Sequence, residues 1–317
     1  MRAMIVAAGL GTRLRPLSDL RPKPALPVRG IPLITYTLAL LARHGVSEVV
    51  VNAHHLPDAL MEAARRHCPA GVTLQFSIES EILDTGGGIR RIASFLRESD
   101  PCLILAGDML LDTDLSRLVA IHRSRKDAFT LLLRARDERA GSFGTIGVDR
   151  DDRVCRIADR FDLGEETRSG IYTWVNVVAA RAFDTLPERD VFSYLDDWIA
   201  PELSAGAQDI RAEVAEPIDC LWEPVGTPAE YLAVNLDPVR LSYREAIAGA
   251  QRNGAHCEGD LVIGAGAVIG TGANLRRAVI WDGERVDDGL QASGGVFAGG
   301  KFHRCDPPSQ IESARKS

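Results

Sequence analysis

The stretch AAGLGTRLRP, from Ala7 to Pro16, decides the fold of this chain. It overlaps the end of a short apolar run over residues 3–8, which predicts a buried strand. Gly9 and Gly11 allow a tight turn, and Arg13 adds a planar guanidinium that suits phosphate oxygens. A loop between a buried strand and a helix points its backbone N–H groups beyond the strand's carboxyl end, where open parallel sheets bind ligands. The stretch therefore predicts an α/β sheet with a phosphate-binding loop at its edge.

Two better-known glycine loops are absent from this position. The dinucleotide fingerprint GxGxxG fails because Leu14 stands where its third glycine should be, and the sequence contains no GxxxxGK[ST]. The interpretation of the chain as an NAD-dependent oxidoreductase would be supported only by the α/β pattern. The absence of the GxGxxG fingerprint argues against it.

Apolar runs alternate with helical patterns over the first half of the chain. The expected strands cover 3–8, 49–52, 72–78 and 102–106, and the expected helices cover 32–44, 57–67, 88–96 and 115–125. This alternation predicts a Rossmann-like mixed, mostly parallel sheet with helices on both faces. Beyond about residue 128 the pattern becomes strand-rich, with runs at 128–134, 143–148, 153–158 and 174–179, before helices resume near Asp190. We expect these later strands to be antiparallel additions.

A different period follows a helical stretch expected over 228–252. Steps of six residues from Val262 reach largely small or apolar positions at 268, 274, 280, 286 and 292, with Gly264 and Gly270 in a second register. A six-residue period is typical of a β-helix, here of about two coils and left-handed, which would serve packing or oligomerisation. A glycine-rich hairpin tail is the alternative. The expected organisation is an α/β domain over 1–235, a helical linker over 236–255, the β-helix over 256–303 and a disordered tail over 304–317.

Composition narrows the class of protein. A formal net charge of −7 over 317 residues argues against a nucleic-acid-binding protein. No apolar stretch is long enough to span a bilayer, and the six cysteines are dispersed without a CxxC pair, which suits a reducing compartment. We therefore expect a cytoplasmic protein that binds neither nucleic acid nor membrane.

A stiffened lysine follows the glycine loop. Lys23 lies between two prolines in PKPALPV, over residues 22–28, and each proline restricts its own and its neighbour's backbone. Such restraint indicates a phosphate-binding lysine. AAGLGTRLRP followed by PKPALPV is similar to the N-terminus of sugar-1-phosphate nucleotidylyltransferases, and the resemblance extends over most of residues 1–235. It implies an enzyme that transfers a nucleotide from a nucleoside triphosphate to a sugar 1-phosphate. The nucleotide-binding residues that it implies in the loop are Ala7, Ala8, Gly9, Gly11, Thr12 and Arg13.

A carboxylate follows the apolar run at 102–106. Asp108 ends the sequence GD, and at the carboxyl end of a central strand it can hold Mg²⁺ against a triphosphate. The resemblance implies the same role, so we assign Asp108 to the metal and, with Arg13 and Lys23, to catalysis. The alternative is a turn residue. Asp112 and Asp114 are expected to start and cap the next helix.

The stretch ESEILDTGGGI, from Glu79 to Ile89, is expected to bind the nucleobase. Its glycines permit close approach of a flat ligand, and the residues implied at the base are Glu79, Thr85, Gly86 and Gly87. The Glu79 carboxylate could accept from guanine or uracil, so both bases stay open. The stretch resembles both mannose-1-phosphate guanylyltransferases and N-acetylmuramate-1-phosphate uridylyltransferases. The six-residue repeats favour the guanylyltransferases, hence GTP and a sugar like mannose 1-phosphate.

The sugar side departs from the family. Gly144, in a segment similar to the family's YGxV, and Asn176 on the expected strand at 174–179 are the sugar-binding candidates. The EKP motif that supplies a sugar-binding glutamate is missing, because residues 158–170 read ADRFDLGEETRSG. The acidic residues that could replace it are Asp159, Glu165 and Glu166.

A second departure concerns the metal. Relatives carry WxDxGTP, whereas residues 222–228 read WEPVGTP, so Pro224 stands at the aspartate's position. Glu223 would replace it, or Asp108 and phosphates would hold the metal alone, or the protein is catalytically weak. Strand alternation places Glu223 on the opposite face from Pro224. The principal alternative to an enzyme is therefore a nucleotide-binding regulatory subunit. His54 and His55 are expected to be loop residues without a catalytic role.

Overall fold

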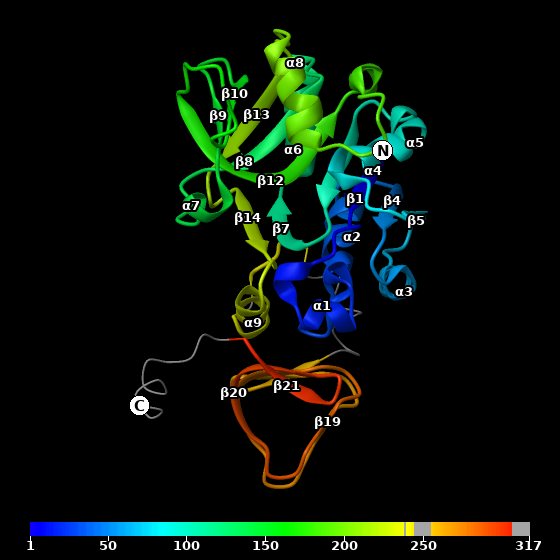
Figure 1. Ribbon diagram of the computed structural model, residues 1–317, viewed down its shortest axis with the longest axis vertical. Coiled ribbons are helices and arrows are strands. Elements are labelled where there is room, and N and C mark those ends of the chain that lie inside the picture. Colours follow the sequence, from blue (N-terminus) through cyan, green and yellow to red (C-terminus); the bar gives the residue numbers. More distant parts are fainter. Residues whose placement is uncertain (238, 244–254, 306–317) are drawn as a thin grey trace.

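A ten-stranded mixed sheet forms the main body of the protein (Figure 1). The computed structural model describes residues 1–237, 239–243 and 255–305. The strands of this body, with those of the two small sheets beside it, are β1 (Arg2–Val6), β2 (Pro27–Val28), β3 (Ile31–Pro32), β4 (Glu48–Ala53), β5 (Thr73–Ile78), β6 (Cys102–Ala106), β7 (Met109–Thr113), β8 (Phe129–Arg134), β9 (Ile146–Val148), β10 (Val154–Ile157), β11 (Phe161–Asp162), β12 (Arg168–Val178), β13 (Ile210–Ala215) and β14 (Cys220–Pro224).

Helices connect these strands. The α-helices are α1 (Leu17–Leu20), α2 (Leu33–Arg43), α3 (Pro57–Arg66), α4 (Asp84–Arg91), α5 (Ala93–Arg97), α6 (Leu115–Arg125), α7 (Ala140–Phe143), α8 (Ala200–Ser204) and α9 (Pro228–Leu236). Shorter 3₁₀ segments are η1 (Thr12–Leu14), η2 (Lys23–Ala25) and η3 (Ala180–Thr185), and η4 (Tyr194–Ile199) is a π-helix.

The centre of the sheet is parallel and its far part is antiparallel. The strand order is β11-β10-β9-β12-β6-β1-β4-β5, with β8 beside β12 and β13 beside β8. β6, β1, β4 and β5 are parallel to one another, whereas β12 runs antiparallel to β6. The predicted α/β sheet with antiparallel additions is therefore confirmed.

Helices cover both faces because the side chains of a strand alternate between them. Along β1, Ala3 and Ile5 pack into one hydrophobic cluster with α2, α3 and α6, and Met4 packs into another with α4, α5 and η4. The residues of both clusters are buried, so the two faces of the sheet are covered. Within the described ranges, no helix combines the length and apolar character needed to cross a bilayer.

Some boundaries differ from those expected. The helix expected at 88–96 begins at Asp84 and is interrupted before Ala93. Phe143 ends helix α7, so the strand expected from there begins only at β9. Asp114 caps α6 by accepting from Arg117 N, as expected, whereas Asp112 belongs to β7. Helix α9 ends at Leu236 because Pro238 follows closely. The rest of the expected helix, over 244–252, and most of the tail expected at 304–317 lie outside the described residues.

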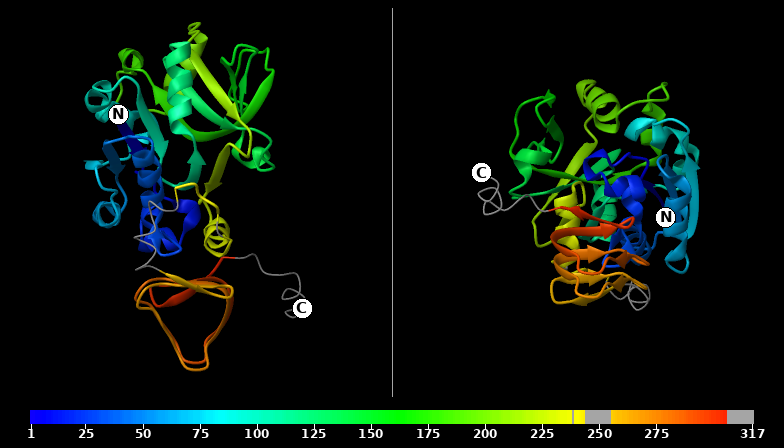
Figure 2. Two further views of the ribbon diagram at one scale, coloured as in Figure 1. Left: turned by 180° about the vertical axis from the view of Figure 1, so that it is seen from behind. Right: turned by 60° about the horizontal axis from the view of Figure 1, so that its bottom comes forward.

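The C-terminal strands wind into a triangular coil below α9 (Figures 1 and 2). They are β15 (His256–Glu258), β16 (Leu261–Ile263), β17 (Val268–Ile269), β18 (Asn274–Ile280), β19 (Arg285–Val286), β20 (Gln291–Ala298) and β21 (Lys301–Arg304). β16, β18 and β20 pair in parallel, as do β17 and β19, which is the pattern of stacked coils.

The expected six-residue register of this coil is only partly right. Leu261 pairs with Ala278, so one coil is shorter than three steps of six. Val268 and Asn274, which belong to the six-residue register that starts at Val262, are exposed. Gly264 and Gly270 stand at corners where an added Cβ would lie 2.3 Å from Asp282 N and 2.6 Å from the carbonyl carbon of Asp287. The second glycine register thus reflects close stacking of one coil on the next.

The coil packs directly on the α/β body. Trp281 Nε1 donates to Tyr231 Oη of α9 over 2.9 Å, and Trp281 lies in the same apolar cluster as helices α2 and α3. The Arg21 guanidinium stacks on the Trp281 ring at 4.7 Å and pairs with Asp282 at 2.9 Å. These contacts bury the top of the coil against the body.

Candidate active site

The glycine loop leaves β1 at the carboxyl edge of the sheet, and a buried amide fixes its start. Asn52, at the end of β4, accepts from Ala7 N over 2.6 Å and donates to Glu79 Oε1 over 2.7 Å. Asn52 and Glu79 are both almost fully buried. Asn52 was not predicted as a site residue, although it ends a predicted strand beside the loop's own strand. Ala7 is therefore a positioned backbone group whose N–H is already used.

The remainder of the loop keeps its backbone donors available. Gly11 adopts φ 62°, and its carbonyl accepts from Ser18 Oγ over 2.8 Å and from Leu14 N over 2.9 Å. The N–H groups of residues 8–13 have no acceptor within the described part of the chain. Arg13 is exposed, and its guanidinium likewise has no hydrogen-bond or ion-pair partner among the described residues. Free N–H groups beside a free guanidinium suit an anion.

Lys23 and Asp108 meet across the loop. Lys23 Nζ donates to Asp108 Oδ2 over 2.7 Å, and the lysine side chain is 12% exposed against 43% for the aspartate. The proline-bounded segment places Lys23 in η2, and the end of β6 places Asp108. The two residues chosen from separate motifs thus lie side by side.

Strand β14 brings Pro224 to the same place. Pro224 pairs with Met109 in the β14–β7 register, and Val225 N donates to the Asp108 carbonyl over 3.1 Å. Pro224 therefore lies beside Asp108, where it offers no side-chain ligand.

Glu223 is held away from this position. Its Oε2 accepts from Arg139 Nη1 over 2.8 Å. Arg139 also binds Asp137, whose pKa it lowers to about 2, and its guanidinium lies 5.1 Å from the Trp222 ring centroid. The expected alternation is confirmed, because Trp222 and Pro224 line a cavity that Glu223 does not reach.

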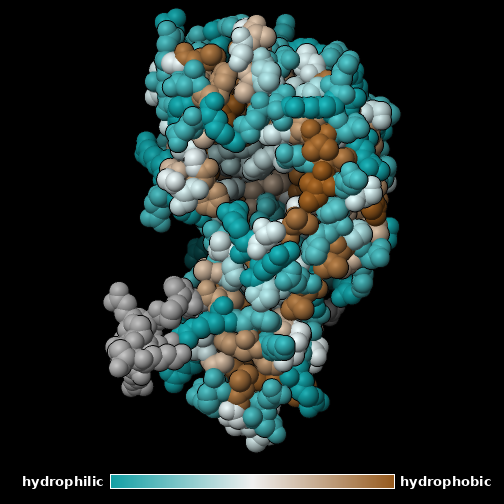
Figure 3. Space-filling view, viewed as in Figure 1, coloured by the Kyte–Doolittle hydropathy of each residue, from teal (hydrophilic) through white to brown (hydrophobic). Residues whose placement is uncertain are grey.

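Three adjoining hollows share Asp108. The loop hollow is lined by Gly9, Gly11, Thr12, Arg13, Lys23 and Asp108. The Glu79 hollow is lined by Ala8, Gly9, Asn52, Glu79, Thr85 and Asp108. The Arg160 hollow contains Arg13, Lys23, Asp108, Gly144, Trp174 and Arg160 and has a volume of about 360 Å³, within the usual range for small-molecule sites. Figure 3 shows this face of the molecule hollowed in its upper half.

The Glu79 hollow differs from the expectation for its glycines. Gly86 and Gly87 lie in helix α4, where both N–H groups donate to the Phe192 carbonyl. An added Cβ on Gly86 would lie 2.2 Å from the Phe192 ring, and one on Gly87 would lie 1.9 Å from Asp190 O. The space beside these two glycines is therefore occupied by Phe192 and Asp190 of the chain itself, and not by a base. Glu79 and Thr85 line the hollow, and their contact with a base stays a prediction.

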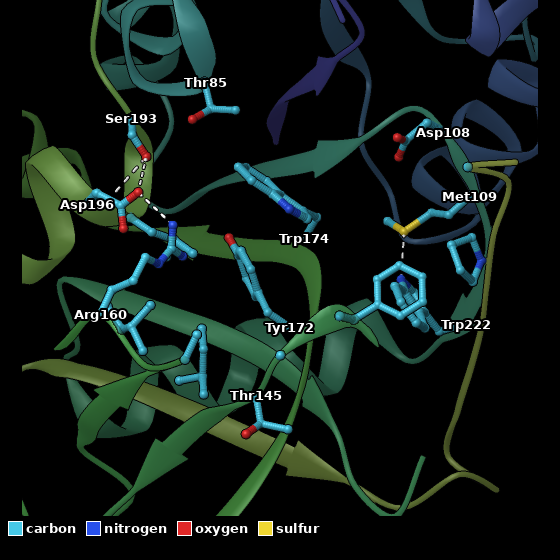
Figure 4. Close-up of a pocket in the computed structure, with 18 of the residues that line it drawn as sticks. Thr85, Asp108, Met109, Thr145, Arg160, Tyr172, Trp174, Ser193, Asp196 and Trp222 are labelled. Carbon is cyan, nitrogen blue, oxygen red and sulfur yellow. Dashed lines mark hydrogen bonds and ion pairs between the residues drawn. The ribbon is translucent and has the colours of Figure 1, made fainter. Parts of the chain in front are cut away.

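Trp174 forms the wall between two hollows. It lines both the Glu79 hollow and the Arg160 hollow, at a register shift in β12, and its φ of 59° is unusual for a bulky residue. Its ring lies 5.1 Å from the Tyr172 ring (Figure 4). Asp84, at the start of α4, lines the same two hollows. Trp174 carries no signal in the sequence, because the bulge arises only on pairing, whereas Asp84 lies within the stretch expected to bind the nucleobase.

The sugar-binding candidates separate in the structure. Gly144, with φ 73°, lines the Arg160 hollow as expected. Asn176 does not, and its assignment to the sugar is wrong. It is fully buried, accepts from Tyr172 Oη over 2.7 Å and donates to the Ile104 carbonyl over 3.3 Å. Asn176 therefore orients Tyr172 from within the sheet.

The acidic substitutes for the missing motif are also absent from the hollow. Asp159 and Glu165 are exposed outside it, and Glu166 pairs with Arg156, which lowers the pKa of Glu166. The stretch at 158–170 instead contributes Arg160. The two histidines left without a role make structural contacts, His54 with the Glu79 carbonyl and His55 with the Ser18 carbonyl, each at 2.9 Å.

The donor set fits a hard cation held mainly by a ligand. No group of three or more His, Cys, Asp or Glu side chains suited to a metal occurs in the described residues. Asp108 lies where the three hollows meet, and only its Oδ2 is engaged by Lys23. Mg²⁺ commonly takes one or two protein carboxylates and completes its shell with phosphates and water. The residues present thus fit Mg²⁺ with a single protein carboxylate.

Comparisons with known proteins agree with this arrangement. Residues 2–239 match the family model described as nucleotidyl transferase. Mannose-1-phosphate guanylyltransferase from Mycobacterium tuberculosis is 33% identical over 90% of this chain and 81% of its own length. UTP--glucose-1-phosphate uridylyltransferase from Synechocystis is 25% identical over 92% of this chain and 85% of its own length.

Solved structures share the fold. The crystal structure of HddC from Yersinia pseudotuberculosis has a TM-score of 0.59 at 23% identity and covers 73% of this chain and 96% of its own. A glucose-1-phosphate thymidylyltransferase described as putative, from Bacillus anthracis, has a TM-score of 0.59 at 16% identity and covers 79% of this chain and 95% of its own. At these identities the likeness concerns the fold alone.

Proposed function

Because the chain belongs to the nucleotidyl transferase family, we propose that it transfers GMP from GTP to a sugar 1-phosphate of the mannose type, with release of pyrophosphate. The observation that carries this proposal is that three hollows share Asp108, so a base, a phosphate chain and a sugar can meet at one carboxylate. The relative from M. tuberculosis supports guanine and mannose.

The proposed reaction is an in-line attack of the sugar phosphate oxygen on the α-phosphorus of the nucleotide. A phosphate monoester is already anionic near neutral pH, so the attacking oxygen needs no strong general base. The protein must instead bring two anions together and stabilise the charge that develops. The loop N–H groups and Arg13 would hold the triphosphate, and Lys23 would move from Asp108 to a phosphate oxygen.

We assign Mg²⁺ to Asp108, with phosphate oxygens as its other ligands. When bound, the ion neutralises the phosphates and polarises the reacting group. The missing aspartate at Pro224 leaves the ion more dependent on the nucleotide. The left-handed sense of the coil, an oligomer formed through it and a cytoplasmic location stay predictions.

Two other functions remain as alternatives. A uridylyltransferase acting on N-acetylmuramate 1-phosphate or a related sugar phosphate is supported by the Synechocystis relative, whose name specifies UTP. A regulatory subunit that binds nucleotide without turnover is supported by Pro224.

One screen tests all three. GTP, UTP, dTTP, CTP and ATP are each combined with mannose, glucose, N-acetylmuramate and heptose 1-phosphates, and pyrophosphate release is measured. Highest release from GTP with mannose 1-phosphate supports the proposal, and highest release from UTP supports the first alternative. Tight triphosphate binding by calorimetry with no release from any pair supports the regulatory subunit.

A further inference from the structure

An ion pair closes the end of the Arg160 hollow away from Asp108. Arg160 Nη1 donates to Asp196 Oδ2 over 2.8 Å, and Ser193 Oγ donates to the same oxygen over 3.3 Å. Arg160 comes from the turn between β10 and β11, and the other two come from the start of η4. All three line the hollow, and Figure 4 shows Tyr172 and Trp174 between them and Asp108.

We propose that Arg160 and Asp196 read the sugar hydroxyls remote from the phosphate, and that their balanced charge selects a neutral sugar over one with a second anionic group. This inference rests on the proposed function and specifies its substrate class. It assigns sugar recognition to a pair that stands in for the missing EKP motif.

The placement of the pair follows from the two ends of the hollow. A sugar 1-phosphate whose phosphate lies near Arg13 and Lys23 extends its ring toward Arg160. The Tyr172 and Trp174 rings offer apolar surface to the C–H face of the sugar. The outer hydroxyls then meet a guanidinium that donates and a carboxylate that accepts, the two functions that recognition of a hydroxyl requires.

The selectivity follows from charge. Arg160 lines the hollow and pairs with Asp196 at 2.8 Å, so the Asp196 carboxylate neutralises its charge. A carboxylate on the sugar would either lie beside the Asp196 carboxylate or displace it, and like charges at short range disfavour binding. N-Acetylmuramate 1-phosphate, which carries a lactyl carboxylate, should therefore be a poor substrate.

Accessibility separates this role from a structural one. The side chains are 57% exposed for Arg160 and 41% for Asp196. An exposed ion pair contributes at most about 1 kcal/mol to stability. Removing either charge should leave the fold intact, so effects on the substrate can be measured in a folded protein.

Two variants and a matched control test the pair. Arg160→Met should raise the KM for mannose 1-phosphate about tenfold, the loss of one charged hydrogen bond, and leave the KM for GTP within about twofold. Asp196→Asn leaves Arg160 unopposed, so the ratio of kcat/KM for N-acetylmuramate 1-phosphate to that for mannose 1-phosphate should rise about tenfold. Arg97→Met, which breaks a surface pair with Asp184 at 2.7 Å outside all three hollows, should change none of these values.

Product binding supplies a readout that does not need turnover. Calorimetry compares GDP-mannose with GDP, and UDP-glucose with UDP, on the wild type and Arg160→Met. The wild type should bind one of the two nucleotide sugars more tightly than the corresponding nucleoside diphosphate. In Arg160→Met the ratio of these two dissociation constants should shrink about tenfold. Equal preference in both proteins overturns the inference, as does wild-type preference for N-acetylmuramate 1-phosphate over mannose 1-phosphate. Absence of pyrophosphate release from every pair instead contradicts the proposed function, and the calorimetric comparison still tests Arg160.

Discussion

Lys23 Nζ lies 2.7 Å from Asp108 Oδ2, so the proposed phosphate ligand and the proposed metal ligand are hydrogen-bonded to each other. In the absence of substrate, the Lys23 ammonium and the Asp108 carboxylate neutralise each other's charge. Binding of the triphosphate with Mg²⁺ would replace this ion pair by two new contacts, Lys23 with a phosphate oxygen and Asp108 with Mg²⁺. This exchange makes the two side chains separable by mutation.

Asp108→Asn should reduce kcat by at least about 100-fold at saturating Mg²⁺, because the amide is a far weaker ligand for a hard cation. The thermal unfolding temperature should change little, since the side chain is 43% exposed. Pyrophosphate release and thermal unfolding check the two statements. Undiminished turnover would remove Asp108 from the site.

Lys23→Ala should lower kcat/KM about 100-fold through weaker binding of the phosphates, since a charged donor is lost. The Mg²⁺ concentration for half-maximal rate should not rise, because Asp108 loses a competing cation. Steady-state kinetics at several Mg²⁺ concentrations measure both. An unchanged kcat/KM would contradict the phosphate role.

Asn52→Ala should destabilise the protein by about 1–3 kcal/mol, because Ala7 N–H and the buried Glu79 carboxylate each lose a partner. It should also raise the KM for the triphosphate, since the start of the loop is no longer fixed. Denaturant unfolding and kinetics test this. Asn274→Ala, an exposed position on the coil, is the control and should leave both unchanged. A stable variant with normal KM would show that the loop does not depend on Asn52.

Pro224→Asp should lower the Mg²⁺ concentration needed for half-maximal rate, because it adds a second carboxylate beside Asp108. Glu223→Gln should not affect this concentration, because Glu223 lies on the opposite face and pairs with Arg139. Magnesium titrations of the initial rate make the comparison. The prediction is wrong if the two variants behave alike.

Stability should fall below neutral pH because of His122. This side chain is 3% exposed and hydrogen-bonded to Thr130, and burial lowers its pKa from 6.5 to about 4. The unfolded chain therefore takes up a proton below pH 6.5 that the folded chain refuses until about pH 4, so the free energy of unfolding decreases by about 3 kcal/mol across that window. Denaturant unfolding at pH 7 and pH 4.5 should show a smaller decrease for His122→Gln. An equal decrease would exclude His122 as the cause.

The central strands and helices followed from the sequence because apolar periodicity is a local property. β1, β4 and β6 lie within or close to their expected ranges, and α2, α3 and α6 lie within a residue or two of theirs. The predicted ends of helices and strands were wrong where packing against another segment determines them. The helix at Asp84 starts early because its glycines pack against Phe192, which is distant in the sequence.

The site divides in the same way. Arg13, Lys23 and Asp108 were found from the sequence because a glycine loop, a proline-bounded lysine and a strand-ending aspartate each constrain the backbone locally. Asn176 was misassigned because its face depends on the pairing of β12 with β6 and β8. Arg160 and Trp174 carry no local signal, since each acquires its position from partners far along the chain. Asn52 ends a predicted strand, but its contacts with Ala7 and Glu79 exist only in the folded protein.

The sequence by itself therefore determined the order of strands and helices, the phosphate loop and the two charged residues that follow it, because short-range periodicity and backbone restraint encode them. Only the tertiary structure decided that Lys23 and Asp108 are paired, that Glu223 points away while Pro224 faces the cavity, and that Arg160 stands where an acidic residue was expected. These relations depend on strand register and on contacts between distant segments, which no local pattern specifies.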